Sequence, residues 1–272
     1  MTVFAGNLLA GRNAFVAGGT SGINLAIAEA FARHGARLAV LSRRQDKVDA
    51  AVAALSRHGP AAGYAADVRD FTAVQTALAA FHAQCGPVDI VVSGAAGNFV
   101  APASGISSNG FRTVLEIDLL GTFNVLRAAY PLLRKPGASL ISISAPQSTA
   151  VSFGQAHVSA AKAGIDMLTR CLAVEWGREG VRVNAIVPGP IDDTEGMARL
   201  APTPELRLAF ERSCPLGRFG TKQEIADLAL FMASDAAGYM TGTVTYCDGG
   251  QVLTMGGAAP GASLPAATSN GD

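Results

Sequence analysis

The chain has 272 residues, and its 21 lysines and arginines balance 21 aspartates and glutamates, so the formal net charge is zero. This balance, with no basic run longer than Arg43-Arg44, excludes the clustered positive charge by which proteins bind nucleic acids. Hydrophobic residues make up 49% of the chain and charged residues 15%, which excludes disorder over most of it, while no apolar run of about 18 residues would span a membrane.

Short β-rich segments alternate with segments of helical periodicity from near the start of the chain to about residue 250. The predicted strands are 14–17, 37–41, 63–66, 88–92, 139–143, 181–187 and 244–246. Apolar stripes at helical spacing lie between them, as at Leu25, Ala28 and Phe31. Apolar strands flanked by helices are buried on both faces, which indicates a parallel sheet. We expect a single α/β domain with a Rossmann-type, doubly wound parallel sheet of about seven strands.

The predicted domain covers residues 1–255, without a linker or internal repeat. Residues 256–272 have little periodicity and no charge before Asp272. We expect a flexible, low-complexity tail there, with packing on a neighbouring subunit as the alternative.

The cysteines are too far apart in the sequence to suggest a metal site or a redox pair; they are Cys85, Cys171, Cys214 and Cys247. This spacing predicts reduced thiols, no bound metal and a cytoplasmic protein.

A glycine-rich turn follows the first predicted strand and leads directly into a helix. Glycines at such a junction let the backbone approach a diphosphate, and the free N–H groups of the helix start point at it. A tight turn without a ligand is the alternative, but the position at the first strand-to-helix junction favours a dinucleotide. The expected cofactor contacts here are Gly18, Thr20, Ser21, Gly22 and Ile23.

The second strand ends in Ser42, Arg43 and Arg44, about 20 residues past the turn, where NAD-specific folds place an acid. Guanidinium groups bind a 2′-phosphate that a carboxylate would repel, so these residues favour NADP(H) over NAD(H). The arginines could instead be solvated residues at a helix start. Asp67, followed by Val68, either accepts a hydrogen bond from the adenine amino group or caps the next helix.

Taken in order along the chain, these motifs resemble those of the short-chain dehydrogenase/reductase family over about residues 8–255. The resemblance rests on the glycine turn, Asp67-Val68, Ser93-Gly94-Ala95-Ala96-Gly97, Lys162, Pro188-Gly189-Pro190 and Asp248-Gly249-Gly250. It implies a nicotinamide cofactor and a homotetramer. It also implies further cofactor contacts by Val68, Ala95, Lys162, Pro188, Gly189 and Ile191.

Most of the catalytic residues that the resemblance implies are replaced. Val158 stands where the family has a tyrosine four residues before Lys162, Ala145 occupies the serine position, and Asp118 occupies the helix asparagine position. No tyrosine occurs between residues 131 and 238, so these segments cannot supply a phenol. Ordinary carbonyl reduction is disfavoured because valine cannot deliver the proton that the carbonyl oxygen needs.

At these positions the chain is similar to the peroxisomal-type 2,4-dienoyl-CoA reductases, a subgroup of the family. The similar segments are 95–99, 118–124, 157–163 and 188–196. The resemblance implies an NADPH-dependent enzyme of fatty acid metabolism that reduces a conjugated, 2,4-dienoyl-CoA-like thioester. Asn24 departs from the family pattern, which usually has a third glycine at this position.

In that reaction negative charge spreads onto the thioester oxygen, so a donor or cation must face it, and water can deliver the proton later. We expect Lys162 to hold the nicotinamide ribose and Asp118 to order a water or carry the proton. A plain buried ion pair is the alternative for these two residues. Asn98 and Phe99, just past the fourth strand, are the predicted substrate contacts, with a loop role as their alternative.

His157 and Thr194 each have a structural interpretation beside the chemical one. His157 is turned by about 100° from position 158 on a helix and favours a packing role. Thr194 either caps the following helix or contacts the cofactor.

Two other functions remain open. One is a short-chain dehydrogenase/reductase acting on another small carbonyl or conjugated substrate. The other is a catalytically inactive NADP-binding protein.

Overall fold

The computed structural model describes residues 4–255. In this part of the chain one parallel sheet of seven strands has the order β3-β2-β1-β4-β5-β6-β7. The strands are β1 (Asn13–Ala17), β2 (Arg37–Ser42), β3 (Ala61–Ala65), β4 (Ile90–Ser93), β5 (Ser139–Ile143), β6 (Arg182–Pro188) and β7 (Val244–Cys247). Every predicted strand is present, so the predicted α/β fold class is confirmed. The expected tail, 256–272, lies outside the described residues.

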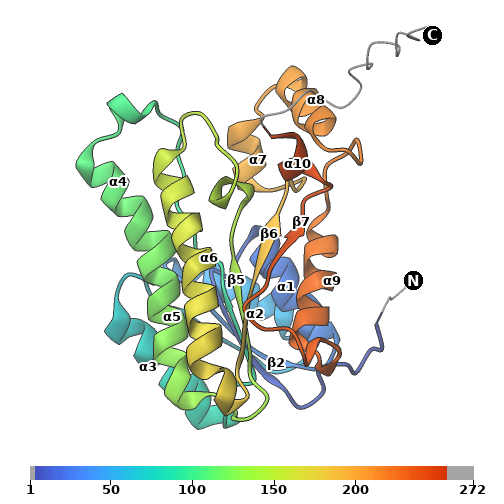
Figure 1. The fold of residues 1–272 in the computed structure, drawn as a ribbon. Coiled ribbons are helices and arrows are strands. Elements are labelled where there is room, and N and C mark those ends of the chain that lie inside the picture. The colour runs from blue at the N-terminus through green and yellow to red at the C-terminus, as the bar shows by residue number, and fades with distance from the viewer. Residues whose placement is uncertain (1–3, 256–272) are drawn as a thin grey trace, which may run out of the picture.

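Helices cover both faces of the sheet (Figure 1). One face carries α1 (Gly22–Arg33), α2 (Gln45–Leu55) and α9 (Lys222–Ala233), and the other carries α3 (Phe71–Cys85), α5 (Gly121–Ala129) and α6 (Ala156–Trp176). The remaining helices are α4 (Ser108–Leu115), α7 (Glu195–Leu200), α8 (Pro204–Ser213) and α10 (Gln251–Thr254). No helix among the described residues is long and apolar enough to cross a membrane.

The core forms two layers because successive side chains of a strand point to opposite faces. Val16 and Ile141 pack with α1 and α9, whereas Phe15 and Leu140 pack with α3, α5 and α6. All five residues of β1 and of β5 are buried. This explains why the central strands are mostly apolar, with Asn13, Ser139 and Ser142 as their buried polar residues, and why they could be recognised in the sequence.

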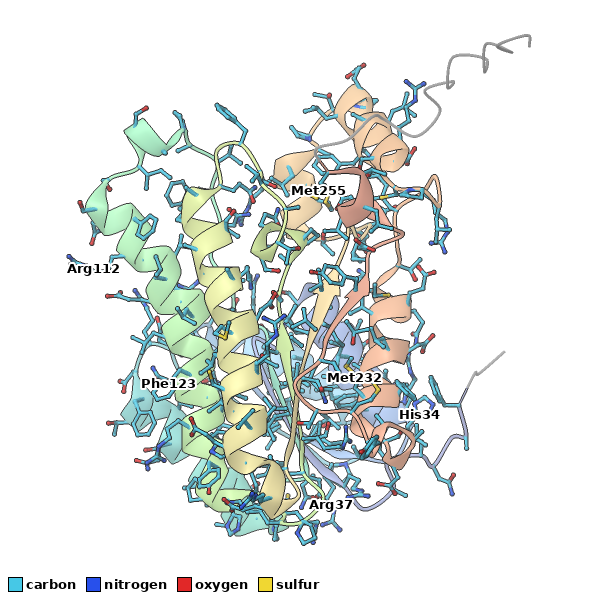
Figure 2. The ribbon with its side chains drawn as sticks, viewed as in Figure 1. His34, Arg37, Arg112, Phe123, Met232 and Met255 are labelled. Atoms are coloured by element: carbon cyan, nitrogen blue, oxygen red, sulfur yellow. The ribbon has the colours of Figure 1, made fainter. Side chains whose placement is uncertain are left out.

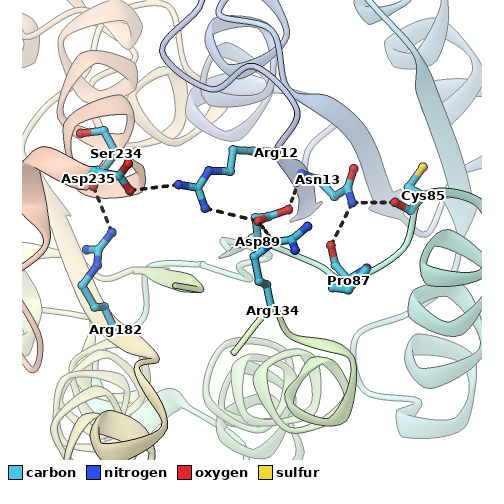
Figure 3. Close-up of polar contacts among 9 residues, drawn as sticks. All are labelled: Arg12, Asn13, Cys85, Pro87, Asp89, Arg134, Arg182, Ser234 and Asp235. Carbon is cyan, nitrogen blue, oxygen red and sulfur yellow. Dashed lines mark hydrogen bonds and ion pairs between the residues drawn. The ribbon is translucent and has the colours of Figure 1, made fainter. Parts of the chain in front are cut away.

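The beginnings of the strands are joined by a polar network around Asp89 (Figure 3). Asp89 is 1% exposed, and its Oδ2 accepts a hydrogen bond from the backbone N–H of Asn13 over 2.9 Å. Arg12 and Arg134 donate to its Oδ1. The buried carboxylate therefore has cationic and backbone donors, and it ties β1 to the segment that leads into β4.

The opposite edge of the sheet, where the strands end, is the edge that matters for function. Figure 2 shows Met255 at this end of the molecule and Arg37, the first residue of β2, at the other. The strand order reverses between β1 and β4, and open α/β sheets bind ligands in the crevice at such a point. Helices α7, α8 and α10 gather above this edge (Figure 1).

Candidate active site

The turn between β1 and α1 needs glycine. Gly18 has a φ of +79°, and a Cβ at this position would lie 2.8 Å from the backbone nitrogen of Ala95. Helix α1 begins at Gly22, and among the described residues its N-cap, Ser21, makes no side-chain hydrogen bond to the helix start. The first N–H groups of α1 are therefore available to an anion, which fits a dinucleotide diphosphate.

Asn24 occupies the position where the resemblance implies a third glycine. Its Nδ2 donates a hydrogen bond to the carbonyl oxygen of Gly94 over 2.8 Å. The side chain of Asn24 therefore points to the segment after β4, and the turn keeps its glycines at positions 18 and 22. A Cβ on Gly94 would lie 2.3 Å from Oδ1 of Asn24, so this contact in turn requires glycine at position 94.

A cavity of about 280 Å³ opens beside this turn, at the ends of β1, β2, β3 and β4. Nine of the predicted cofactor contacts line it: Gly18, Thr20, Ser21, Ser42, Arg43, Arg44, Asp67, Val68 and Ala95. Ile23, Lys162, Pro188, Gly189 and Ile191 line a neighbouring cavity of about 660 Å³. Gly22, the first residue of α1, is not among the residues that line these two cavities. The structure thus places all of the predicted cofactor contacts except Gly22 along two neighbouring cavities.

The two arginines predicted to bind a 2′-phosphate are in different situations. Arg44 donates from Nε to Oδ1 of Asp46 over 3.0 Å, and this pairing raises the pKa of Arg44 and lowers that of Asp46. Arg43 lines the cavity and has no side-chain partner within residues 4–255. Arg43 is therefore the better placed of the two to bind a phosphate.

Asp67 does not cap the next helix. The N-cap of α3 is Asp70, whose Oδ1 accepts from the backbone N–H of Ala73 over 3.0 Å. Asp67 instead accepts from the backbone and the guanidinium of Arg69, and these hydrogen bonds lower the pKa of Asp67, with a smaller contribution from the charge of Arg43. The capping alternative is wrong, and the ionised carboxylate lines the cavity.

Asp118 and Lys162 meet beneath the larger cavity. Asp118 is fully buried in a π-helical turn, Glu116–Leu120, between α4 and α5. Lys162 projects from α6, and its Nζ lies 3.2 Å from Oδ2 of Asp118 and donates to the carbonyl oxygen of Ile143 over 3.0 Å. The other oxygen of Asp118, Oδ1, accepts from the backbone N–H of Gly97 over 2.7 Å. Two residues 44 positions apart in the sequence thus form one buried pair that borders the cavity.

Among residues 4–255, the side chains that line the cavity around this pair include no phenol. Val158, one helical turn before Lys162, is 4% exposed and lines the cavity. Ser144 also lines it, and within the described residues its buried Oγ has no hydrogen-bond partner. Ser144 could hardly be selected from the sequence, because serine is common in strands and loops. Its place directly after β5 was the available signal.

The two predicted substrate contacts separate in the structure. Asn98 lines the larger cavity. Phe99 instead packs its ring against that of His157, with centroids 4.2 Å apart and an edge-on geometry. His157 is fully buried, and its Nδ1 accepts from the backbone N–H of Val158 over 2.9 Å, which agrees with a packing role.

Thr194 is the N-cap of α7. Its Oγ1 donates to the carbonyl oxygen of Ile191 over 2.9 Å and accepts from the backbone N–H of Met197 over 3.2 Å. The capping interpretation is confirmed, and Thr194 also borders the larger cavity.

Comparison with known proteins shows the family to which the chain belongs. The family described as enoyl-(acyl carrier protein) reductase matches residues 17–251. The peroxisomal 2,4-dienoyl-CoA reductase [(3E)-enoyl-CoA-producing] of Arabidopsis thaliana is 42% identical over 262 residues, which cover 92% of this chain and 88% of that protein. The protein of the same name from Rattus norvegicus is 42% identical over 259 residues, covering 93% and 88%.

Among solved structures, a gluconate 5-dehydrogenase from Burkholderia cenocepacia in complex with NADP and tartrate superposes with a TM-score of 0.86 at 27% identity. The alignment covers 91% of this chain and 98% of that one. Fold and site together are those of an oxidoreductase. The chain belongs to the short-chain dehydrogenase/reductase family.

Proposed function

We propose that this protein reduces a 2,4-dienoyl-CoA thioester with NADPH. The observation that carries the proposal is the buried pair of Asp118 and Lys162 at a cavity where Val158 takes the place of the family's tyrosine. A site with a titratable acid and a cation but no phenol suits reduction of a conjugated carbon–carbon bond better than reduction of a ketone. The names of the relatives support the same substrate class.

The smaller cavity suits NADP(H). The start of α1 offers N–H groups to the diphosphate, and Arg43 offers a guanidinium to a 2′-phosphate. Asp67 is ionised and can accept a hydrogen bond from the adenine amino group. When bound, the cofactor supplies the hydride that reduces the diene.

Lys162 and Asp118 have distinct roles in the proposal. The ammonium group of Lys162 is held by Ile143 and Asp118 and adds positive potential where negative charge develops on the substrate. Asn98 and the unpartnered Oγ of Ser144 are the candidate donors to the thioester oxygen. Asp118 orders a water, or carries the proton, for protonation of the carbon nearer the thioester.

The CoA part of the substrate carries several phosphate charges and needs a charged wall. Arg199 of α7 lines the larger cavity and pairs with Glu195 over 3.3 Å. Arg199 is the one charged side chain of α7 and α8 that lines this cavity, and it is therefore the candidate contact for the CoA end of the substrate.

One assay tests the proposal. Purified protein is mixed with NADPH and 2,4-hexadienoyl-CoA, nicotinamide absorbance is followed, and the product is identified by NMR. We expect a 3-enoyl-CoA. Oxidation of NADPH by a small ketone but not by the dienoyl-CoA would favour a different substrate, and tight NADPH binding without any turnover would indicate an inactive binding protein.

We further propose a cytoplasmic homotetramer. The homotetramer is supported by exposed apolar residues at the end of the π-helical turn and on α5 and α6, namely Leu120, Phe123, Met167 and Val174. The cytoplasmic location is supported by the free thiols of the described cysteines. Sedimentation of the purified protein tests the assembly. Fractionation of the native cells tests the location, and recovery with peroxisomes, as the relatives' names suggest, would contradict it.

A further inference from the structure

The loop between β5 and α6 exposes two large apolar side chains. Val151 is 97% exposed and Phe153 is 88% exposed, although they lie only two residues apart. Neighbouring apolar side chains that are left in water mark a contact surface more often than an isolated one does.

This loop belongs to the wall of the larger cavity. Phe153 and Val100 line the cavity together with Asp118 and Lys162. The backbone N–H of Ala101 donates to the carbonyl oxygen of Gly154 over 3.0 Å, so the loop is fastened to the segment that follows β4. Val100, Val151 and Phe153 are called the apolar lip below.

The two walls of the cavity differ in charge. Residues 97–111 and 144–156, which include the apolar lip, contain no aspartate, glutamate, lysine or arginine. On the opposite side, Arg199 is the one charged residue among the residues of α7 and α8 that line the cavity. A CoA thioester has a polyanionic end and a hydrocarbon end, so the uncharged wall suits the hydrocarbon end.

We propose that the apolar lip binds the acyl chain beyond the diene and gives the enzyme a preference for longer dienoyl thioesters. This inference rests on the proposed function, and it adds the residues that set chain-length specificity. The chain leaves the cavity over Phe153 toward Val151, which lines the adjoining cavity that Phe153 also borders, while the CoA end lies on the side of Arg199.

The expected size of the effect follows from apolar burial. Complete burial of one methylene strengthens binding about fourfold. A chain on an open lip is covered on one side, so we expect about a twofold gain in kcat/KM for each added methylene. Between a six-carbon and a ten-carbon substrate, which differ by four methylenes, the gain is then about sixteenfold.

The experiment compares the parent protein with Val151→Ser/Phe153→Ser on six-, ten- and fourteen-carbon 2,4-dienoyl-CoA substrates. We expect the double variant to lose about tenfold in kcat/KM on the ten-carbon substrate, through KM, and less than about twofold on the six-carbon one. The single variant Phe153→Leu, with Val151 intact, should keep most of the parent's kcat/KM on the ten-carbon substrate because leucine keeps an apolar surface. Tyr239→Ser is the matched control, since Tyr239 is fully exposed and follows α9, away from both cavities.

A double variant that keeps the parent's chain-length dependence would overturn the proposal, as would an equal loss on all three substrates. A changed oligomeric state or changed vesicle binding, with chain-length dependence intact, would assign the lip to another partner and also overturn it. If the parent protein reduces no dienoyl-CoA, the proposed function fails separately. The lip is then tested by calorimetry with hexanoyl-CoA and dodecanoyl-CoA, where loss of the affinity difference in the double variant supports it and an unchanged difference contradicts it.

Discussion

Lys47 of α2 and Glu195, the first residue of α7, meet across the smaller cavity, with Nζ 3.4 Å from Oε1. Both residues line this cavity, and Glu195 also lies 3.3 Å from the guanidinium of Arg199, which borders the larger one. One carboxylate thus stands between a cation on the proposed phosphate side and a cation on the proposed substrate side.

Replacing this carboxylate should strengthen NADPH binding. Glu195→Gln removes a negative charge from the cavity that we propose for the 2′-phosphate and frees Lys47 to approach it. We expect the Kd for NADPH to fall about threefold at low salt, and less at high salt because these groups are exposed and screened. Fluorescence titration at two ionic strengths measures this. Glu205→Gln on α8 is the control, and weaker NADPH binding by Glu195→Gln would refute the expectation.

Asp118→Asn should separate catalysis from binding. The amide keeps the shape of the side chain but cannot carry the proton, so we expect kcat for dienoyl-CoA to fall by about 10² to 10³. The Kd for NADPH, measured by titration, should change by less than about threefold. Turnover at the parent rate would remove the carboxylate from the mechanism.

A paired replacement distinguishes catalysis from a purely structural ion pair. Removing one partner of a buried pair costs about 3–5 kcal/mol, whereas replacing both by apolar residues of similar volume is often neutral. We expect Asp118→Leu/Lys162→Met to unfold in urea close to the parent midpoint and to be inactive. If the double variant is both stable and active, the pair is dispensable for the reaction.

Arg43 and Arg44 should differ in their effect on cofactor choice. Arg43→Ala removes the unpaired guanidinium, and we expect the Kd for NADPH to rise about 10- to 100-fold while that for NADH hardly changes. Arg44→Ala, whose guanidinium already pairs with Asp46, should have a smaller effect. Titration of each variant with both cofactors tests this. Equal effects of the two changes would show that the pairing with Asp46 does not keep Arg44 from binding the 2′-phosphate.

Glu224 predicts part of the acid sensitivity of the fold. Hydrogen bonds from Arg218 and from the backbone of Thr221, in the capping box of α9, lower the pKa of Glu224 from 4.5 to about 2. Such a carboxyl stabilises the fold above its unfolded pKa, and this contribution is lost as the pH falls from about 4.5 to about 2. Solvent screening reduces it to about 1 kcal/mol. We expect Glu224→Gln, which can still cap the helix, to lower the Tm at neutral pH by about 3 °C. The difference from the parent should narrow below pH 4.5, and a constant difference across this range would contradict the assignment.

Much of the fold could be predicted because β1 and β5 are buried over their whole length and are therefore mostly apolar and rich in β-forming residues. The glycine turn was equally predictable from the sequence, since the positive φ of Gly18 and its close contact with Ala95 require glycine. These features are local, because each of them depends on the types of a few consecutive residues.

The pairing of Asp118 with Lys162 could not be found in this way. The two residues lie on different helices, so only the family resemblance brought them together. The π-helical turn at Glu116–Leu120 also has no periodic signature in the sequence, although such turns often occur at functional sites. The engagement of Arg44 by Asp46 depends on side-chain orientation, which a sequence pattern does not specify.

The short segment from Gly94 to Gly97 is hydrogen-bonded at both ends. The carbonyl oxygen of Gly94 accepts from the side chain of Asn24, and the backbone N–H of Gly97 donates to Asp118. The cofactor turn and the buried acid are therefore not separate modules that can be exchanged one at a time. Asn24→Gly would remove the hydrogen bond at Gly94, and the resulting shift of Asp118 would change the turnover rate.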